Sequence, residues 1–163
     1  MGSIDEEALD EKNQRFFITD RANNRVMVWG VHPDRLTATP EAMAVLGQQD
    51  FMSRQPGKVQ AGFNRPGDHY YDAKTDRLFV ADSGNNRALV FDVAPGKLRN
   101  GMTASEVLGQ PDFESTSAGT PADRFTNPSG LAYDHRFNIV RHNVPDRHRI
   151  AARATEAAHL LWI

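Results

Sequence analysis

The chain has 163 residues, a quarter of them charged, with a net charge of −2 and a pI near 6.3. This length is typical of a single domain, and the slightly acidic balance disfavours a surface that binds nucleic acids. The complete lack of cysteine excludes disulfides and cysteine-ligated zinc sites.

The first element in chain order is an acidic N-terminal extension over residues 1–9. It has no basic start followed by an apolar run, so it is not predicted to be a signal peptide. No apolar segment approaches the ~20 residues that a helix needs to span a bilayer. The sequence as given therefore predicts a soluble, cytoplasmic protein with no membrane partner, or an extracytoplasmic one if a leader has been lost.

A gap-free repeat with a period of 62 residues follows the extension. Asp10–Asp76 and Asp72–Asn138 are identical at 25 of 67 aligned positions. A fixed period is the signature of a repeat protein, in which each unit buries its faces against its neighbours. The chain thus divides into the extension, two repeats over 10–138 and a divergent tail over 139–163. The identities cluster in three pairs of runs: Arg15–Arg25 with Arg77–Arg87, Val45–Phe51 with Val107–Phe113, and Phe63–Asp72 with Phe125–Asp134.

Each repeat predicts four short strands, most clearly in the second copy. Leu78–Ala81 is a continuous apolar run, which indicates a strand covered on both faces. Ser83–Asn86 has turn chemistry, so Ala88–Phe91 is the returning strand of a hairpin. Glu106–Gly109 predicts a short outer strand, and Ser129–Asp134 predicts a fourth strand. No part of the chain before residue 140 shows helical periodicity of any length.

Short antiparallel strands in groups of four, covered on both faces and repeated along the chain, predict blades of a β-propeller. A solenoid is the competing repeat architecture. The hairpins argue against it, because parallel β-helices advance by coils. The predicted fold class is therefore all-β, a partial β-propeller of two four-stranded antiparallel blades.

The strings LFVADSGNNRALVFD, VLGQPDF and NPSGLAYD resemble the NHL-repeat β-propeller family, in its bacterial long-blade type. The resemblance covers Asp10 to about Asn138. It implies that Gly67–Asp72 and Gly130–Asp134 are the innermost strands and line a central channel. It also implies that Val45–Gly47 and Val107–Gly109 are outer strands. Family propellers close with about six blades, and this chain holds two full periods.

The tail after Asn138 departs from the repeat and is rich in arginine, histidine and alanine. From Arg147 to Ile163 the pattern becomes helical, after the start signals Pro145 and Asp146. Such a helix would cap the end of the blade stack. The alternative is a frayed tail without a fixed place. The apolar positions of the predicted helix share one stripe: Ile150, Ala154, Ala157 or Ala158, and Leu161.

Two blades cannot close a ring, so an apolar blade face is predicted at each end. Covering about 400 Å² of such a face is worth ~10 kcal/mol before entropic costs. The partner that covers it is predicted to be the tail helix, further copies of this chain or another protein. Three copies of two blades would complete a six-bladed ring.

Paired charges flank both predicted hairpin turns. Asp20 and Arg25, like Asp82 and Arg87, are placed to pair across two strands. Their repetition indicates a structural role, because a catalytic residue is needed only once per site. The same argument makes the neighbouring asparagines turn formers and the repeated aromatic residues inter-blade packing: Asn23, Asn24, Asn85 and Asn86 for the turns, and Trp29, Phe91, Phe51 and Phe113 for the packing.

The six histidines form no HxH or HExxH pattern, so no metal site is predicted from spacing. The exception of interest is His69, with Asp68 before it. These two residues stand where the second repeat has Gly130 and Leu131. If their strand is innermost, they lie near a channel mouth and are candidate ligand-binding residues; local polarity is the default alternative.

The residues thus predict no catalytic, cofactor or metal site. The leading interpretation is a non-enzymatic propeller scaffold or interaction module, either truncated or completed to a ring by self-association. The alternative is a metal-dependent lyase or hydrolase of NHL type, with a channel site that includes His69. RNA binding is disfavoured by the pI.

Overall fold

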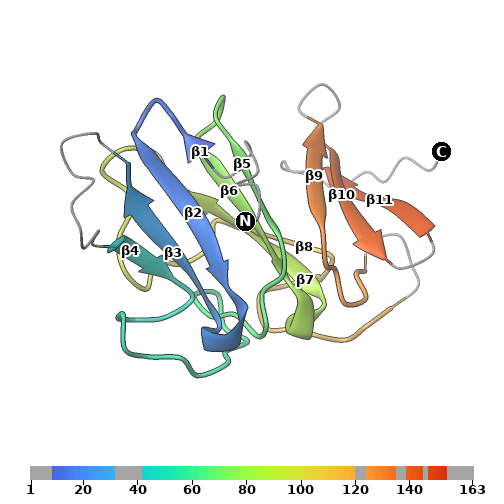
Figure 1. Ribbon diagram of the computed structural model, residues 1–163. Helices are drawn as coiled ribbons and strands as arrows, with labels where there is room; N and C mark the ends of the chain where they lie inside the picture. Colours follow the sequence, from blue (N-terminus) through green and yellow to red (C-terminus); the bar gives the residue numbers. More distant parts are fainter. Residues whose placement is uncertain (1–8, 32–41, 120–123, 135–138, 145–146, 154–163) are drawn as a thin grey trace.

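A computed structural model describes residues 9–31, 42–119, 124–134, 139–144 and 147–153, with backbone alone from residue 132 onward. Almost the whole predicted N-terminal extension and the end of the tail, residues 154–163, lie outside the described residues. The described part is all-β and forms three antiparallel sheets that stand next to one another in chain order (Figure 1).

The first two sheets have four strands each, and in both the order across the sheet is the order along the chain. The prediction of two four-stranded antiparallel sheets is confirmed. The strand before Asp72 lies at one edge of its sheet, and the strand at Val107 lies at the other. The first sheet contains β1 (Leu9–Asp10), β2 (Arg15–Asp20), β3 (Arg25–Gly30) and β4 (Ala42–Leu46). The second contains β5 (His69–Asp72), β6 (Arg77–Asp82), β7 (Arg87–Asp92) and β8 (Glu106–Leu108).

Both predicted hairpin turns are present. Short 3-10 turns at Arg21–Asn23 and Ser83–Asn85 join β2 to β3 and β6 to β7. Each turn ends at an asparagine with φ of 53°, Asn24 or Asn86, in the left-handed region that asparagine tolerates better than most residues. The turns set the register, so that each aspartate before the turn lies opposite the arginine after it.

The tail joins a third sheet, and here one prediction needs correction. The helix predicted from Arg147 is wrong over residues 147–153, which form a strand. The strand predicted at Ser129–Asp134 is present over Leu131–Asp134 and opens the third sheet, as β5 opens the second. The sheet order is β11-β10-β9, from β9 (Leu131–Asp134), β10 (Ile139–Val144) and β11 (Arg147–Arg153).

The physical reason lies in backbone hydrogen bonding. β9 offers a row of N–H and C=O groups along its edge, and antiparallel pairing with β10, then of β10 with β11, satisfies them. A helical stripe of mostly alanine buries little and does not compete with that pairing. β9 and β10 begin 62 residues after β5 and β6. The spacing of the strands therefore continues into the tail, although the sequence similarity does not.

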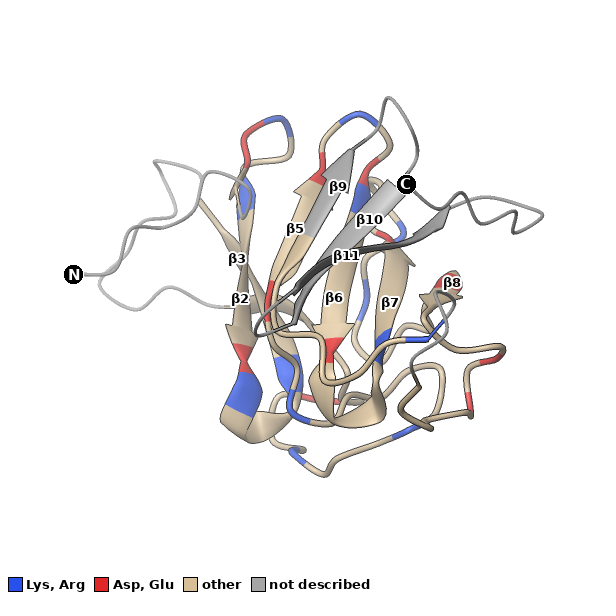
Figure 2. Ribbon diagram, turned by 90° about the vertical axis from the view of Figure 1, so that its right-hand side faces the viewer, with Lys and Arg blue, Asp and Glu red and all other residues tan. Residues whose placement is uncertain are grey.

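Two apolar layers separate the three sheets. The first core layer lies between the first and second sheets, and the second core layer lies between the second and third. β6 supplies both, because alternate residues point to opposite faces: Leu78 and Val80 to the first layer, Phe79 and Ala81 to the second. The predicted two-sided burial of this strand is confirmed. Charged residues of β2 and β6 gather near the strand ends (Figure 2).

Two of the three shared runs meet at a glycine. Gly47 and Gly109 have φ of 86° and 79°, and the rings of Phe63 and Phe125 lie directly against them. A Cβ at either glycine would overlap the ring, so the VLGQ run and the phenylalanine of the following run are needed together.

Candidate interaction face on the first sheet

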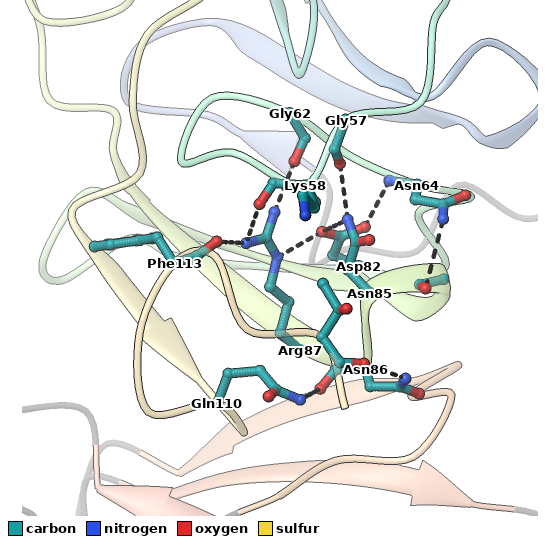
Figure 3. Close-up of polar contacts among 12 residues, drawn as sticks. Gly57, Lys58, Gly62, Asn64, Asp82, Asn85, Asn86, Arg87, Gln110 and Phe113 are labelled. Atoms are coloured by element: carbon teal, nitrogen blue, oxygen red, sulfur yellow. Dashed lines mark hydrogen bonds and ion pairs between the residues drawn. The ribbon is translucent and has the colours of Figure 1, made fainter. Parts of the chain in front are cut away.

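The second repeat encloses its predicted charge pair completely. Arg87 Nε donates to Asp82 Oδ2 at 2.7 Å, and both side chains are 0% exposed (Figure 3). The carboxylate also accepts from the backbone N–H of Asn64 at 2.7 Å and from the side-chain amide of Asn85 at 2.8 Å. Burial raises the pKa of Asp82, and the N–H of Asn64 and the Arg87 guanidinium oppose that rise.

The remaining donors of Arg87 reach backbone carbonyls. Its Nη1 donates to Lys58 at 3.0 Å and to Phe113, and its Nη2 donates to Val59 at 3.1 Å and Gly62 at 3.0 Å. Three of these four acceptors belong to the preceding repeat. A guanidinium has five N–H donors in a rigid fork, so one side chain joins two repeats here.

The first repeat has the same pair in a partly open form. Arg25 Nε donates to Asp20 Oδ2 at 2.8 Å, and its Nη1 donates to the carbonyl of Phe51. The arginine and aspartate side chains are 17% and 26% exposed. Burial acts to raise the pKa of Asp20, but hydrogen bonds from Asn23 and Arg25 outweigh it and the pKa lies below its usual value.

An apolar surface lies beside this pair, on the side of the first sheet that points away from the second. We name it the open face. Ile18 is 44% exposed and Met43 is 50% exposed, while Val80, the counterpart of Ile18 one period later, is 0% exposed. The open face consists of Phe16, Ile18, Met27, Trp29 and Met43. The counterparts of its first four residues all lie fully buried in the first core layer: Leu78, Val80, Leu89 and Phe91.

The prediction that the repeated aromatic residues pack between blades is confirmed in the second repeat but not in the first. Phe91 and Phe113 pack in or against the first core layer, as predicted. Trp29 is half-buried on the open face, and Phe51 is 37% exposed. The same residue type is therefore buried or exposed according to whether another repeat covers its sheet.

Asp68 and His69 lie where sheets adjoin. His69 Nδ1 and Thr19 Oγ1 are 2.9 Å apart and join β5 to the first sheet. Asp68 accepts from its neighbour's N–H at 2.8 Å and from the N–H of Leu131, in the third sheet, at 3.3 Å. The other five histidines lie outside the residues whose side chains are described. Within the described residues, no group of three or more potential ligands could hold a metal ion.

The repeat explains the identity of the Thr19–His69 pair. One period later the same positions hold Ala81 and Leu131, which are buried together in the second core layer. A polar contact at one interface thus takes the place of an apolar contact at the next.

The sequence interpretation missed a second buried charge cluster, at the start of the first sheet. Arg15 Nε donates to Asp10 at 2.6 Å, and its Nη2 donates to the carbonyl of Val93 in the second repeat at 2.6 Å. Nearby, Tyr71 donates to Asp76 at 2.7 Å. Burial and the hydrogen bond to Asp76 raise the pKa of Tyr71. The signal was available, because Asp10 and Arg15 recur as Asp72 and Arg77.

Comparison with known proteins adds no family assignment. The chain matches no protein-family model and no curated protein. In the part of the chain that is described, no helix is long and apolar enough to cross a membrane. The NHL resemblance stays a prediction.

The two arginines provide a matched stability test. We expect Arg87→Ala to lower the free energy of unfolding by about 3–5 kcal/mol, because it leaves Asp82 buried and unpaired. Arg25→Ala should cost about 1 kcal/mol or less, because its pair is partly hydrated. Urea unfolding followed by circular dichroism measures both, and equal losses would contradict the difference in burial.

A double-mutant cycle tests the Thr19–His69 contact. Each of Thr19→Ala and His69→Leu should cost about 1 kcal/mol by removing one hydrogen-bond partner. The double variant, which copies the apolar pair of the second repeat, should recover most of that loss. Additive losses in the same unfolding assay would show that the two side chains are not coupled.

Asp10 should contribute to acid lability. Burial acts to raise its pKa, but hydrogen bonds from Asn13 and Arg15 prevail and hold the pKa below the ordinary 3.8. Its contribution is therefore complete above about pH 4 and is lost as pH falls below that value. Asp10→Asn should lower stability at pH 7 and flatten the stability profile between about pH 4 and pH 2. An unchanged acid slope would refute this assignment.

Proposed function

We propose that this chain is a non-enzymatic scaffold of the β-propeller type, related to the NHL-repeat proteins, which binds a protein partner through the open face. The proposal rests on a comparison of the open face with its equivalent surface on the second sheet. Residues that are fully buried on the second sheet have counterparts on the first sheet that are half-buried or exposed. Contiguous exposed apolar residues on a sheet mark an interaction surface.

Three features support a propeller arrangement. Strands follow one another across each four-stranded sheet in chain order, consecutive sheets pack face to face, and the third sheet repeats the spacing of the second. This is the blade order that the NHL resemblance implies. In such a ring each blade covers the next, so an uncovered first blade requires a partner, with further copies of the same chain as the simplest case.

Nothing among the described residues favours the metal-dependent lyase or hydrolase. Asp68 and His69 hydrogen-bond to neighbouring sheets, which accounts for their polarity without a ligand. The cytoplasmic location stays a prediction from the N-terminal sequence, and the absence of a nucleic-acid partner stays a prediction from the charge balance.

Solution mass tests the proposal. Light scattering should give a species larger than 18.2 kDa whose mass rises with protein concentration. Ile18→Glu places a charge on the open face and should shift the chain to the monomer. Met52→Glu is the matched control, because Met52 is 85% exposed in the segment after β4 and outside the open face. A monomer at every concentration would contradict self-association through this face.

A further inference from the structure

The interface inside the chain shows what covers a face of this kind. On the second sheet, the counterpart of the open face is covered by apolar residues of the first sheet, which include Phe17, Val26 and Val28. The first repeat also supplies three carbonyl oxygens that accept hydrogen bonds from Arg87. A covering repeat therefore provides two things at once, an apolar sheet face and a set of convergent carbonyl oxygens.

The carbonyls converge because two glycines close the segment that carries them. Gly57 donates to the carbonyl of Phe63 at 2.8 Å. A Cβ at Gly62 would lie only 3.0 Å from the Cα of Gly57, so the two ends of this loop approach as closely as backbones allow. The loop from Gly57 to Gly62 thereby turns the oxygens of Lys58, Val59 and Gly62 toward a single guanidinium.

Arg25 makes the contacts of Arg87 within its own repeat but lacks those with a preceding repeat. Its Nε and Nη1 repeat the contacts of Arg87 with the aspartate and with the phenylalanine carbonyl. Its Nη2, unlike that of Arg87, has no acceptor among the described residues. The open face and this arginine therefore lack the same neighbour, because both of their counterparts in the second repeat are covered by one preceding repeat.

We infer that the open face is a docking site for a complete four-stranded repeat of this same kind, and that Arg25 selects it by donating to the carbonyls of its glycine-closed loop. This inference rests on the proposed function, in which the open face binds protein. It adds the chemistry of the partner: an apolar sheet face with a loop of free carbonyl oxygens at one end.

The third sheet of a second copy, which self-association would bring to the open face, matches only part of this description. Among the described residues it has three strands, whereas the carbonyl loop follows the fourth strand of a repeat. Two periods after Phe17, its strand β10 (IVRHNV) has Arg141 where the apolar complement of the first sheet has a phenylalanine. Burying unpaired arginine on an apolar surface is costly.

The gap-free period allows a direct test in an extended chain. Inserting a second copy of residues 10–71 immediately before Asp10 places its Lys58, Val59 and Gly62 at the same spacing from Arg25 as they have from Arg87. The chain has no cysteine, so Ile18→Cys in the original repeat gives a single thiol on the open face. Its labelling rate by a maleimide reports whether the inserted repeat covers that face.

We expect labelling at Ile18→Cys to be at least tenfold slower in the extended chain than in the parent. Adding Arg25→Ala to the original repeat should restore the parent rate. Arg21→Ala is the control and should leave protection intact, because Arg21 donates to the carbonyls of Arg65 and Pro66, away from the open face. Met52→Cys should label at one rate in both chains.

Each failure has a separate meaning. Equal labelling of Ile18→Cys in both chains, at a concentration where the parent is monomeric, would show that a repeat of this kind does not dock there, even if light scattering had shown association at higher concentration. Protection that survives Arg25→Ala would overturn the selective role of Arg25. Protection in a chain that is itself monomeric would support the inference while contradicting self-association.

Discussion

The buried pair of Asp82 and Arg87 is the contact on which the stacking of the repeats depends. Its carboxylate is satisfied from within the second repeat and from Asn64, while the guanidinium takes three carbonyls from the loop that closes the first repeat. Two ions removed from water are not stabilising by themselves. They are tolerated because both have several hydrogen-bond partners, and four of these partners belong to the preceding repeat: Asn64, Lys58, Val59 and Gly62.

The apolar layers obey the same dependence. A blade-like sheet is apolar on both sides, so each sheet needs two neighbours to bury what its strands present. The second sheet has both, and the apolar residues of β6 and β7 are fully buried. Among the described residues the first sheet has one neighbour, and its second side carries the exposed Ile18 and Met43 beside the partly exposed Arg25. The partner that we propose would thus cover the same kind of surface that joins the repeats inside the chain.

The variation at Asp68 and His69 shows how a repeat tolerates local change. The Thr19–His69 contact does at one interface what buried Ala81 and Leu131 do at the next. A histidine that looks out of place in an alignment of the two repeats is here a contact between sheets. A binding site at this sequence difference would need several potential ligands that converge on one point. Asp68 and His69 instead make hydrogen bonds that join neighbouring sheets.

The sequence alone determined the strands, the hairpin turns and the pairing of each aspartate with its arginine, because these depend on residues close together and recur with the period. It did not predict the third sheet, since the pairing of β10 and β11 depends on the edge of β9 and not on the composition of the tail. It also could not distinguish Arg25 from Arg87, or Trp29 from Phe91. Identical motifs become buried or exposed according to which sheet lies against them, and only the tertiary structure decides that.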